Sequence, residues 1–189
     1  RHAPSIERLA AAVSRLGLSA RVFPVVGDMA DPGLPPAGFD LVWSEGALYN
    51  IGIAHALRVC HGLLRSGGYL AFTDAVWRKA NPPPEVKESF DVDYPAMGAV
   101  PDILAIIAGS GFSLLGHFTL PDEAWWEDFY TPMERRIEHL RAAYAAEPEA
   151  LAVLDQLAQE PDMHRRYSDY YAYEFFVARR GKQMDRCRQ

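Results

Sequence analysis

The stretch FDLVWSEGALYNIG, residues 39–52, carries the pattern from which the fold can be predicted. It opens with an apolar run, Phe39 to Trp43, which is typical of a buried strand. It then turns polar at Ser44-Glu45-Gly46, and helical spacing of apolar residues begins at Ile53. A strand that ends in polar residues and leads into a helix is the basic unit of a parallel sheet covered by helices.

The same order of strand, loop and helix continues on both sides of this stretch. Residues 53–64 place apolar side chains at helical spacing, and a glycine pair is expected to end that helix before a strand over residues 69–73. Upstream, helical spacing predicts a helix over residues 6–16. The β-rich run RVFPVV predicts a further strand over residues 21–26, although its proline favours an edge position.

The second half of the chain adds helices and two more strands. The expected elements are helices over residues 85–90 and 101–108 and strands over residues 112–120 and 170–179. The two strands are expected to pair. Residues 121–166 are rich in helix formers and are interpreted as a helical cap inserted into one domain, residues 1–189. The predicted fold class is α/β, a Rossmann-like, doubly wound and mostly parallel sheet with a late antiparallel strand.

Composition narrows the function classes. The formal net charge of −6 disfavours a nucleic-acid binder, which normally carries a basic stripe. Cys60 and Cys187 lack the spacing of a disulfide framework or a zinc site, and the histidines form no ligand pattern, so no metal is expected. No apolar run approaches the roughly 20 residues of a membrane span. We therefore expect a cytoplasmic protein that contacts neither nucleic acid nor membrane.

Four short motifs identify a resemblance. In chain order they are Gly27-Asp28-Met29, Phe39-Asp40-Leu41-Val42, LLRSGGYL at residues 63–70, and Gly111-Phe112. Together they resemble the class I S-adenosylmethionine-dependent methyltransferases, and WSEGALYNIG further resembles a bacterial subgroup that acts on small molecules. Ser66 stands where the family usually has a proline. The resemblance covers most of residues 6–120 and the late strand, and it implies S-adenosylmethionine as cofactor and S-adenosylhomocysteine as product.

Two motifs of that family are absent from the printed sequence. They are the glycine-rich loop after the first strand and the acid after the second strand that holds the cofactor's ribose. Arg1-His2 resembles the segment that follows this acid, so we expect further natural sequence upstream. The alternative is a chain that cannot bind the cofactor in the usual way, but a sheet without two central strands would expose large apolar faces.

The resemblance implies a set of cofactor-binding residues. Asp28 would accept a hydrogen bond from the adenine amino group, and the backbone N–H of Met29 would meet the adenine ring. Ser44, Glu45 and Gly46 would line the methionine part of the cofactor near its methyl group. An acceptor-only carboxylate suits an exocyclic amine. The competing interpretation of Asp28 is a turn-forming aspartate, and that of Glu45 is a solvated or helix-capping carboxylate.

The candidate catalytic residues are Glu45 and Tyr49. Glu45 could pair with the cationic cofactor or position or deprotonate the acceptor, and Tyr49 could offer a hydroxyl or a ring face to a cation. The candidate substrate-binding residues are Tyr49, Asn50, Asp74, Trp77, Trp125, Trp126 and Tyr130. Asp74 and Trp77 are expected just after the strand 69–73. Adjacent helical residues point about 100° apart, so Trp125 and Trp126 should face different surroundings.

The predicted function is transfer of a methyl group from S-adenosylmethionine to a small-molecule acceptor, with the acceptor atom (N, O, S or C) left open. One alternative is a nicotinamide-dependent oxidoreductase on a similar sheet, but the GxGxxG turn that it needs is not seen. Another is a non-catalytic Rossmann-like binding or assembly protein, if the first strands are truly missing. The sequence leaves the oligomeric state open, with a homodimer as one outcome.

Overall fold

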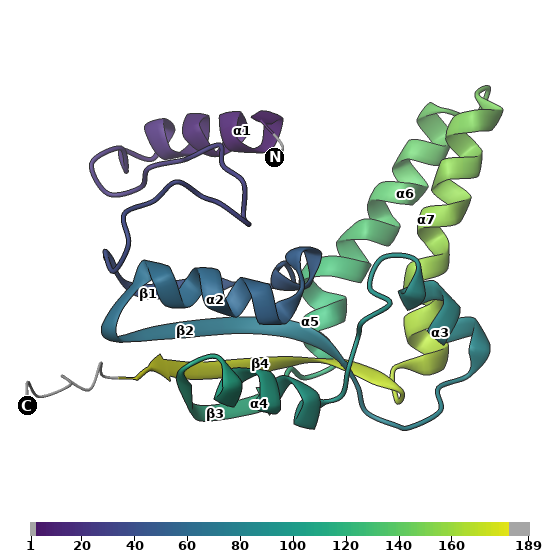
Figure 1. The fold of residues 1–189 in the computed structure, drawn as a ribbon. Coiled ribbons are helices and arrows are strands. Elements are labelled where there is room, and N and C mark those ends of the chain that lie inside the picture. Colours follow the sequence, from purple (N-terminus) through teal and green to yellow (C-terminus); the bar gives the residue numbers. More distant parts are fainter. Residues whose placement is uncertain (1–2, 182–189) are drawn as a thin grey trace, which may run out of the picture.

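The computed structural model describes residues 3–181 and contains a four-stranded mixed sheet in the order β1-β2-β4-β3 (Figure 1). The strands are β1 (Phe39–Ser44), β2 (Leu64–Trp77), β3 (Phe112–Thr119) and β4 (Tyr171–Arg180). β1 runs parallel to β2, whereas β4 is antiparallel to both β2 and β3. The predicted pairing of the late strand with residues 112–120 is therefore confirmed. Arg1-His2 and Cys187, discussed above, lie outside the described residues.

The β1–α2–β2 unit forms as the opening stretch predicts. After β1 come a short 3-10 turn, η1 (Leu48–Ile51), and helix α2 (Ile53–Leu63). The apolar face of α2 is buried at Ile53, Ala56, Leu57 and Cys60. It packs with helix α4 (Val100–Gly109) on one face of the sheet, where Phe72 of β2 and Phe176 of β4 stack with ring centroids 5.1 Å apart. This packing fixes the orientation of β1 and so the edge of the sheet at which β1 ends.

A second apolar cluster lies at the other end of β2. It includes Ala75, Val86 of helix α3 (Pro84–Asp91), Tyr94 and Met97, together with Tyr171 of β4. The aromatic ring of Phe90 packs edge-on against Tyr171 at 4.7 Å. This cluster joins the segment after β2 to the start of β4, so that both border the carboxyl end of β1.

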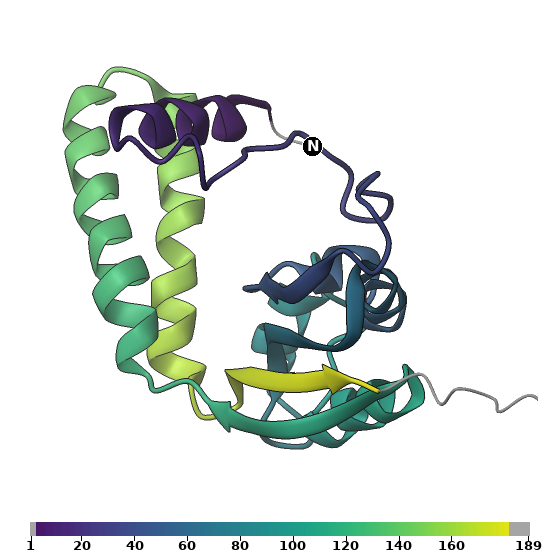
Figure 2. The same cartoon turned by 90° about the vertical axis from the view of Figure 1, so that its left-hand side faces the viewer.

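Between β3 and β4 the chain forms a run of helices. They are α5 (Glu123–Trp125), a π-helical turn η2 (Trp126–Tyr130), α6 (Thr131–Ala143) and α7 (Pro148–Tyr167). Figures 1 and 2 both show α6 and α7 lying side by side and rising away from the sheet. These helices occupy the stretch predicted as a cap. Its division from a single surrounding domain stays a prediction.

Two expectations about strands are wrong. Residues 21–26 form no strand, and Phe23 is 73% exposed. Pro24 cannot donate a ladder hydrogen bond, and within residues 3–181 only β2 pairs with β1. Helix α1 (Ala3–Arg15), which was expected, and the irregular segment after it lie apart from the sheet in both views (Figures 1 and 2).

The strand expected over residues 69–73 is also too short. β2 begins at Leu64, so the glycine pair expected to end the helix lies inside the strand. At the other end, β4 pairs with β2 as far as Trp77, with Asp74 opposite Glu174 and Trp77 opposite Tyr171. Asp74 and Trp77 therefore lie within the strand and not after it. Cross-strand hydrogen bonds from a distant segment extend β2 beyond its local sequence signal.

Candidate active site

The carboxyl end of β1 makes a close approach to β4. Gly46 has a φ of +52°, and its N–H donates to Thr73 Oγ1 at 2.8 Å. A Cβ atom at Gly46 would lie 3.0 Å from the hydroxyl of Tyr173. Glycine is favoured at position 46 for two reasons. Other residues avoid this backbone conformation, and their Cβ atom would lie too close to Tyr173. Ser44, directly before this turn, pairs in register with Phe72 of β2.

Three predicted residues around this turn have different surroundings. Tyr49 is half-buried and stacks on Tyr94 with ring centroids 4.8 Å apart. Glu45 is exposed, and its Oε1 accepts a hydrogen bond from Trp43 Nε1 at 2.7 Å. The side-chain amide of Asn50 donates to the carbonyl of Ala47 at 3.0 Å. Tyr49 thus faces the interior, whereas Glu45 and Asn50 bond to near neighbours at the surface.

Asp74 is a buried acid beside Tyr49. Its side chain is 0% exposed, and Oδ2 accepts a hydrogen bond from the Tyr94 hydroxyl at 2.7 Å. Oδ1 has no hydrogen-bond partner among the described residues. Burial raises the pKa of Asp74 to about 7, against the opposing effect of the hydrogen bond from Tyr94. Burial and the charge of Asp74 also raise the pKa of Tyr94, so its hydroxyl keeps its proton.

An aromatic cavity of about 490 Å³ lies next to Tyr49 and Tyr94. Its aromatic walls are Tyr49, Phe90, Tyr94, Trp125, Tyr130, Tyr171 and Tyr173. A smaller cavity of about 250 Å³ adjoins it and shares Trp125, Glu160 and Tyr173. Together they offer the volume and mainly apolar lining that small-molecule sites have. We call this combined space the aromatic cavity.

The two tryptophans differ in their relation to this cavity. Trp125 lines it and stacks on Tyr173 at 4.7 Å and on His164 at 4.6 Å between ring centroids. Trp126 is not among the lining residues, and the guanidinium of Arg165 lies 4.7 Å from the centre of its ring. Trp125 therefore joins the helices between β3 and β4 to the sheet at the ligand-facing edge.

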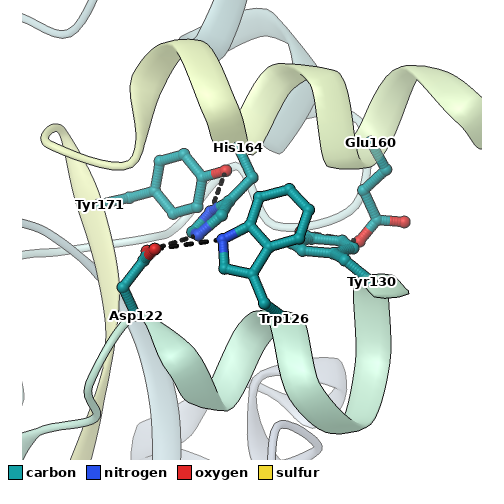
Figure 3. Close-up of polar contacts among 6 residues, drawn as sticks. All are labelled: Asp122, Trp126, Tyr130, Glu160, His164 and Tyr171. Atoms are coloured by element: carbon teal, nitrogen blue, oxygen red, sulfur yellow. Dashed lines mark hydrogen bonds and ion pairs between the residues drawn. The ribbon is translucent and has the colours of Figure 1, made fainter. Parts of the chain in front are cut away.

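A buried histidine holds one wall of the cavity in place (Figure 3). His164 Nδ1 lies 3.0 Å from the Tyr171 hydroxyl, and Nε2 lies 2.9 Å from an oxygen of Asp122. Trp126 Nε1 donates to the other Asp122 oxygen at 3.1 Å. Burial lowers the pKa of His164, although Asp122 opposes this shift. A neutral ring that donates from Nε2 and accepts at Nδ1 satisfies both contacts.

Glu160 of α7 brings a carboxylate to the same cavity. Its Oε1 accepts a hydrogen bond from the buried Tyr130 hydroxyl at 3.3 Å (Figure 3). Glu160 is an exposed residue and lines the cavity. Surrounding protein atoms nevertheless raise its pKa by desolvation, and the charge of Asp93 adds to this effect.

The remaining predicted residues lie elsewhere. Asp28 Oδ1 accepts from the N–H of Ala30 at 3.0 Å, which is the turn-forming role considered above. Met29 is 37% exposed, and neither residue lines the aromatic cavity or ends a strand. Their expected place at a strand end is wrong because residues 21–26 are irregular. Trp77 packs edge-on against Phe90 at 5.4 Å and supports the cavity from behind.

Side chains at this site also come from residues that the sequence did not single out, among them Tyr171, Tyr173 and Glu160. Tyr171 and Tyr173 are two residues apart in a strand and so face one side of the sheet, a signal present in the sequence. Glu160 had no comparable signal, because only the packing of α7 against η2 brings it to Tyr130. Within residues 3–181, no group of three or more His, Cys, Asp or Glu side chains could hold a metal ion. The helices in that range are too short or too polar to cross a membrane.

Comparisons with known proteins agree with this geometry. Residues 3–72 match the family model described as a methyltransferase domain. No curated protein matches the chain significantly. The solved structures include a S-adenosylmethionine-dependent methyltransferase from Geobacter sulfurreducens with S-adenosylhomocysteine, at 20% identity and a TM-score of 0.70, covering 87% of this chain and 67% of that one.

Two further solved structures are similar to this chain. A S-adenosylmethionine-dependent methyltransferase from Thiobacillus denitrificans, also with S-adenosylhomocysteine, has 20% identity and a TM-score of 0.67, covering 92% of this chain and 70% of that one. The [4+2]-cyclase SpnF has 21% identity and a TM-score of 0.69, with 92% of this chain covered. The chain spans 61% of the length of SpnF. The chain therefore has the Rossmann-like fold of the S-adenosylmethionine-dependent methyltransferases and resembles their class I members.

Proposed function

We propose that the protein transfers a methyl group from S-adenosylmethionine to a small-molecule acceptor bound in the aromatic cavity. One observation carries the proposal: Gly46, at the carboxyl end of β1, lies against Tyr173, which lines the cavity. Ligands of open α/β sheets bind at this edge of the sheet. A donor site at Gly46 and an acceptor site at Tyr173 would thus be immediate neighbours.

The residues at this edge suit the methionine part of the cofactor. The close approach at Gly46 leaves no room for a side chain, and Ser44 and Glu45 flank it with polar groups. When bound, S-adenosylmethionine supplies a methyl group that is already electrophilic. We propose that Ser44, Glu45 and Gly46 hold this part, and that Asp28 and Met29 meet the adenine.

The chain's own residues would then align the acceptor. The aromatic walls would hold the acceptor in one orientation, and fixed orientation of two reactants supplies much of the acceleration in such reactions. Tyr49 is the better placed of the two candidate catalytic residues, because it lines the cavity and Glu45 does not. Asp74 positions Tyr94 through their hydrogen bond, and Tyr94 in turn stacks on Tyr49.

The acceptor is proposed to be a small molecule because the cavity has a volume of about 490 Å³ and the chain is acidic, with a net charge of −6. Trp125 and Tyr130 would form its walls, and Asp74, Trp77 and Trp126 would support these walls from outside. Asn50, next to Tyr49, is proposed as a further contact of the acceptor. A homodimer, a bacterial source and a cytoplasmic location belong to the same proposal.

Titration calorimetry of the full-length protein with S-adenosylhomocysteine tests the cofactor site. We expect binding below millimolar concentration, whereas NAD⁺, the matched ligand of the oxidoreductase alternative, should give no heat. Absence of S-adenosylhomocysteine binding at millimolar concentration would overturn the proposal. Because one similar structure is named a cyclase, a second assay follows radioactive methyl groups from S-adenosylmethionine into a set of small amines, alcohols and thiols. Binding without any transfer would contradict the methyl-transfer step.

A further inference from the structure

We propose that the aromatic cavity selects an acceptor that carries a positively charged nitrogen, and that Glu160 is the residue which selects it. An ammonium nitrogen that is itself methylated first gives one proton to the Glu160 carboxylate, which frees the lone pair that attacks the methyl group. A quaternary nitrogen serves for recognition alone, and the methyl group goes to another nucleophilic atom of the same molecule. This inference rests on the proposed function, since it names the class of molecule that would receive the methyl group. It requires three properties of the cavity: its charge, the faces of its aromatic rings, and a carboxylate without a cationic partner.

The charged residues of the cavity have one sign. Among its lining residues Asp93 and Glu160 are acidic, and none is Lys, Arg or His. The nearest arginines along α7 are engaged elsewhere: Arg165 pairs with Glu134 and Asp162. Arg166 pairs with Glu85 at 2.7 Å. An acceptor that carries a phosphate or carboxylate would therefore meet repulsion without a compensating cation.

The aromatic walls offer the second requirement. Trp125 stacks with Tyr173 at 4.7 Å and with Tyr130 at 5.8 Å between ring centroids, so these rings form a continuous lining. A cation within about 6 Å of an uncovered ring face is attracted by the negative potential of that face. Several such rings in one cavity favour a bound ammonium group over a neutral group of equal size.

Glu160 supplies the third requirement. The one hydrogen bond found for it within residues 3–181 comes from Tyr130 to Oε1, and no ion pair joins it to a basic side chain there. Desolvation of the carboxylate raises the pKa of Glu160, and no neighbouring cation among the described residues offsets this rise. A bound ammonium would provide that missing charge. Glu160 lines both parts of the cavity, so a ligand in either part lies beside it.

The helices around Glu160 are irregular at this site. Pro161 follows Glu160 inside α7 and is buried, and a proline there removes one hydrogen bond of the helix. Facing it, Trp126–Tyr130 forms a π-helical turn, a rare element that is frequent at functional sites. Both irregularities flank the Tyr130–Glu160 contact. Their presence at one contact supports a binding role for Glu160 beyond helix packing.

The test compares choline with neohexyl alcohol, its neutral carbon analogue, by titration calorimetry on the protein. Choline is a permanent cation, so no protonation step complicates the comparison. We expect choline to bind about tenfold more tightly than neohexyl alcohol, the difference that ring faces and one carboxylate provide. Equal affinities, or no detectable choline binding at millimolar concentration, would overturn the inference.

Two variants assign the effect to Glu160. Glu160→Gln keeps an oxygen that accepts the Tyr130 hydroxyl and should weaken choline binding about tenfold, with no change for neohexyl alcohol. Glu138→Gln removes one charge from α6 away from the cavity and should leave both affinities unchanged. Unaltered choline binding in Glu160→Gln would contradict the proposal.

The same preparations are titrated with S-adenosylhomocysteine. Discrimination of choline without cofactor binding would leave the cation site standing and remove the methyl-transfer function. If the protein bound S-adenosylhomocysteine but had equal affinity for choline and neohexyl alcohol, the proposed function would stand and the inference about its acceptor would fail.

Discussion

The substitution Gly46→Ala is expected to lower kcat/KM for methyl transfer about tenfold, less than the roughly 100-fold loss that a displacement of about 1 Å among aligned groups can cause. The new methyl group would lie 3.0 Å from the Tyr173 hydroxyl, so Tyr173 or the turn must move. Either movement shifts the acceptor wall relative to the end of β1. Steady-state kinetics with the acceptor found in the labelling assay measure this effect.

Gly17→Ala is the matched control for this substitution. Gly17 also has a positive φ, +66°, but a Cβ there would have no neighbour within 4 Å. Both alanine variants should lose about 1 kcal/mol of stability because alanine disfavours this backbone conformation. Only Gly46→Ala should lose activity. If Gly46→Ala retained the parent kcat/KM, the close contact of Gly46 with Tyr173 would have no part in catalysis.

The second large effect concerns Asp74 and pH. Its pKa is about 7 in the folded protein, against 3.8 for the free side chain. Between these values the folded state keeps a proton that the unfolded chain has lost, so stability falls as pH rises from about 4 to about 7. A difference of about 3 pKa units corresponds to about 4 kcal/mol. Above the folded pKa this contribution stays constant.

Asp74→Asn removes the titrating proton but keeps an oxygen for the Tyr94 hydroxyl. Urea unfolding from about pH 4 to above pH 7 measures the free energy of unfolding of both proteins. The variant should show no fall in this free energy as pH rises, and it should be more stable than the parent above about pH 7. Near pH 4 the two proteins should have similar stability, because a protonated acid and an amide are both neutral. Glu88→Gln, at an exposed position of α3, should keep the parent's pH profile. A parallel decline in Asp74→Asn would show that other groups cause it.

The sequence predicted those parts of the fold whose signals are local. Helix α2 was readable because its apolar residues recur on one face, and β1 because its run ends in a polar turn. Residues 21–26 have strand-like composition, yet a strand needs a partner, and β1 pairs only with β2 within residues 3–181. The full length of β2 could not be predicted from its local sequence either. Its hydrogen bonds come from β4, which lies about a hundred residues later in the chain.

The candidate site divides in the same way. Gly46 and Tyr49 were identified because they follow a strand directly, and ligand sites of this fold lie there. Trp125 and Tyr130 were singled out by composition, and the structure places both in the aromatic cavity. Glu160 and Tyr94 were missed because their importance depends on tertiary contacts with Tyr130 and Asp74. No local pattern encodes such contacts.

The helices between β3 and β4 leave the sheet once and return to it once, and they bring Trp125, Tyr130 and Glu160 to the cavity. The end of β1 belongs to the sheet and contributes none of these side chains. One contiguous piece of the chain thus supplies the helical wall of the proposed acceptor site, while Tyr49, Tyr94 and Tyr173 complete it from other elements. Exchanging residues 121–167 between proteins of this fold would measure how much of the acceptor preference this helical wall carries while the proposed donor edge stays unchanged.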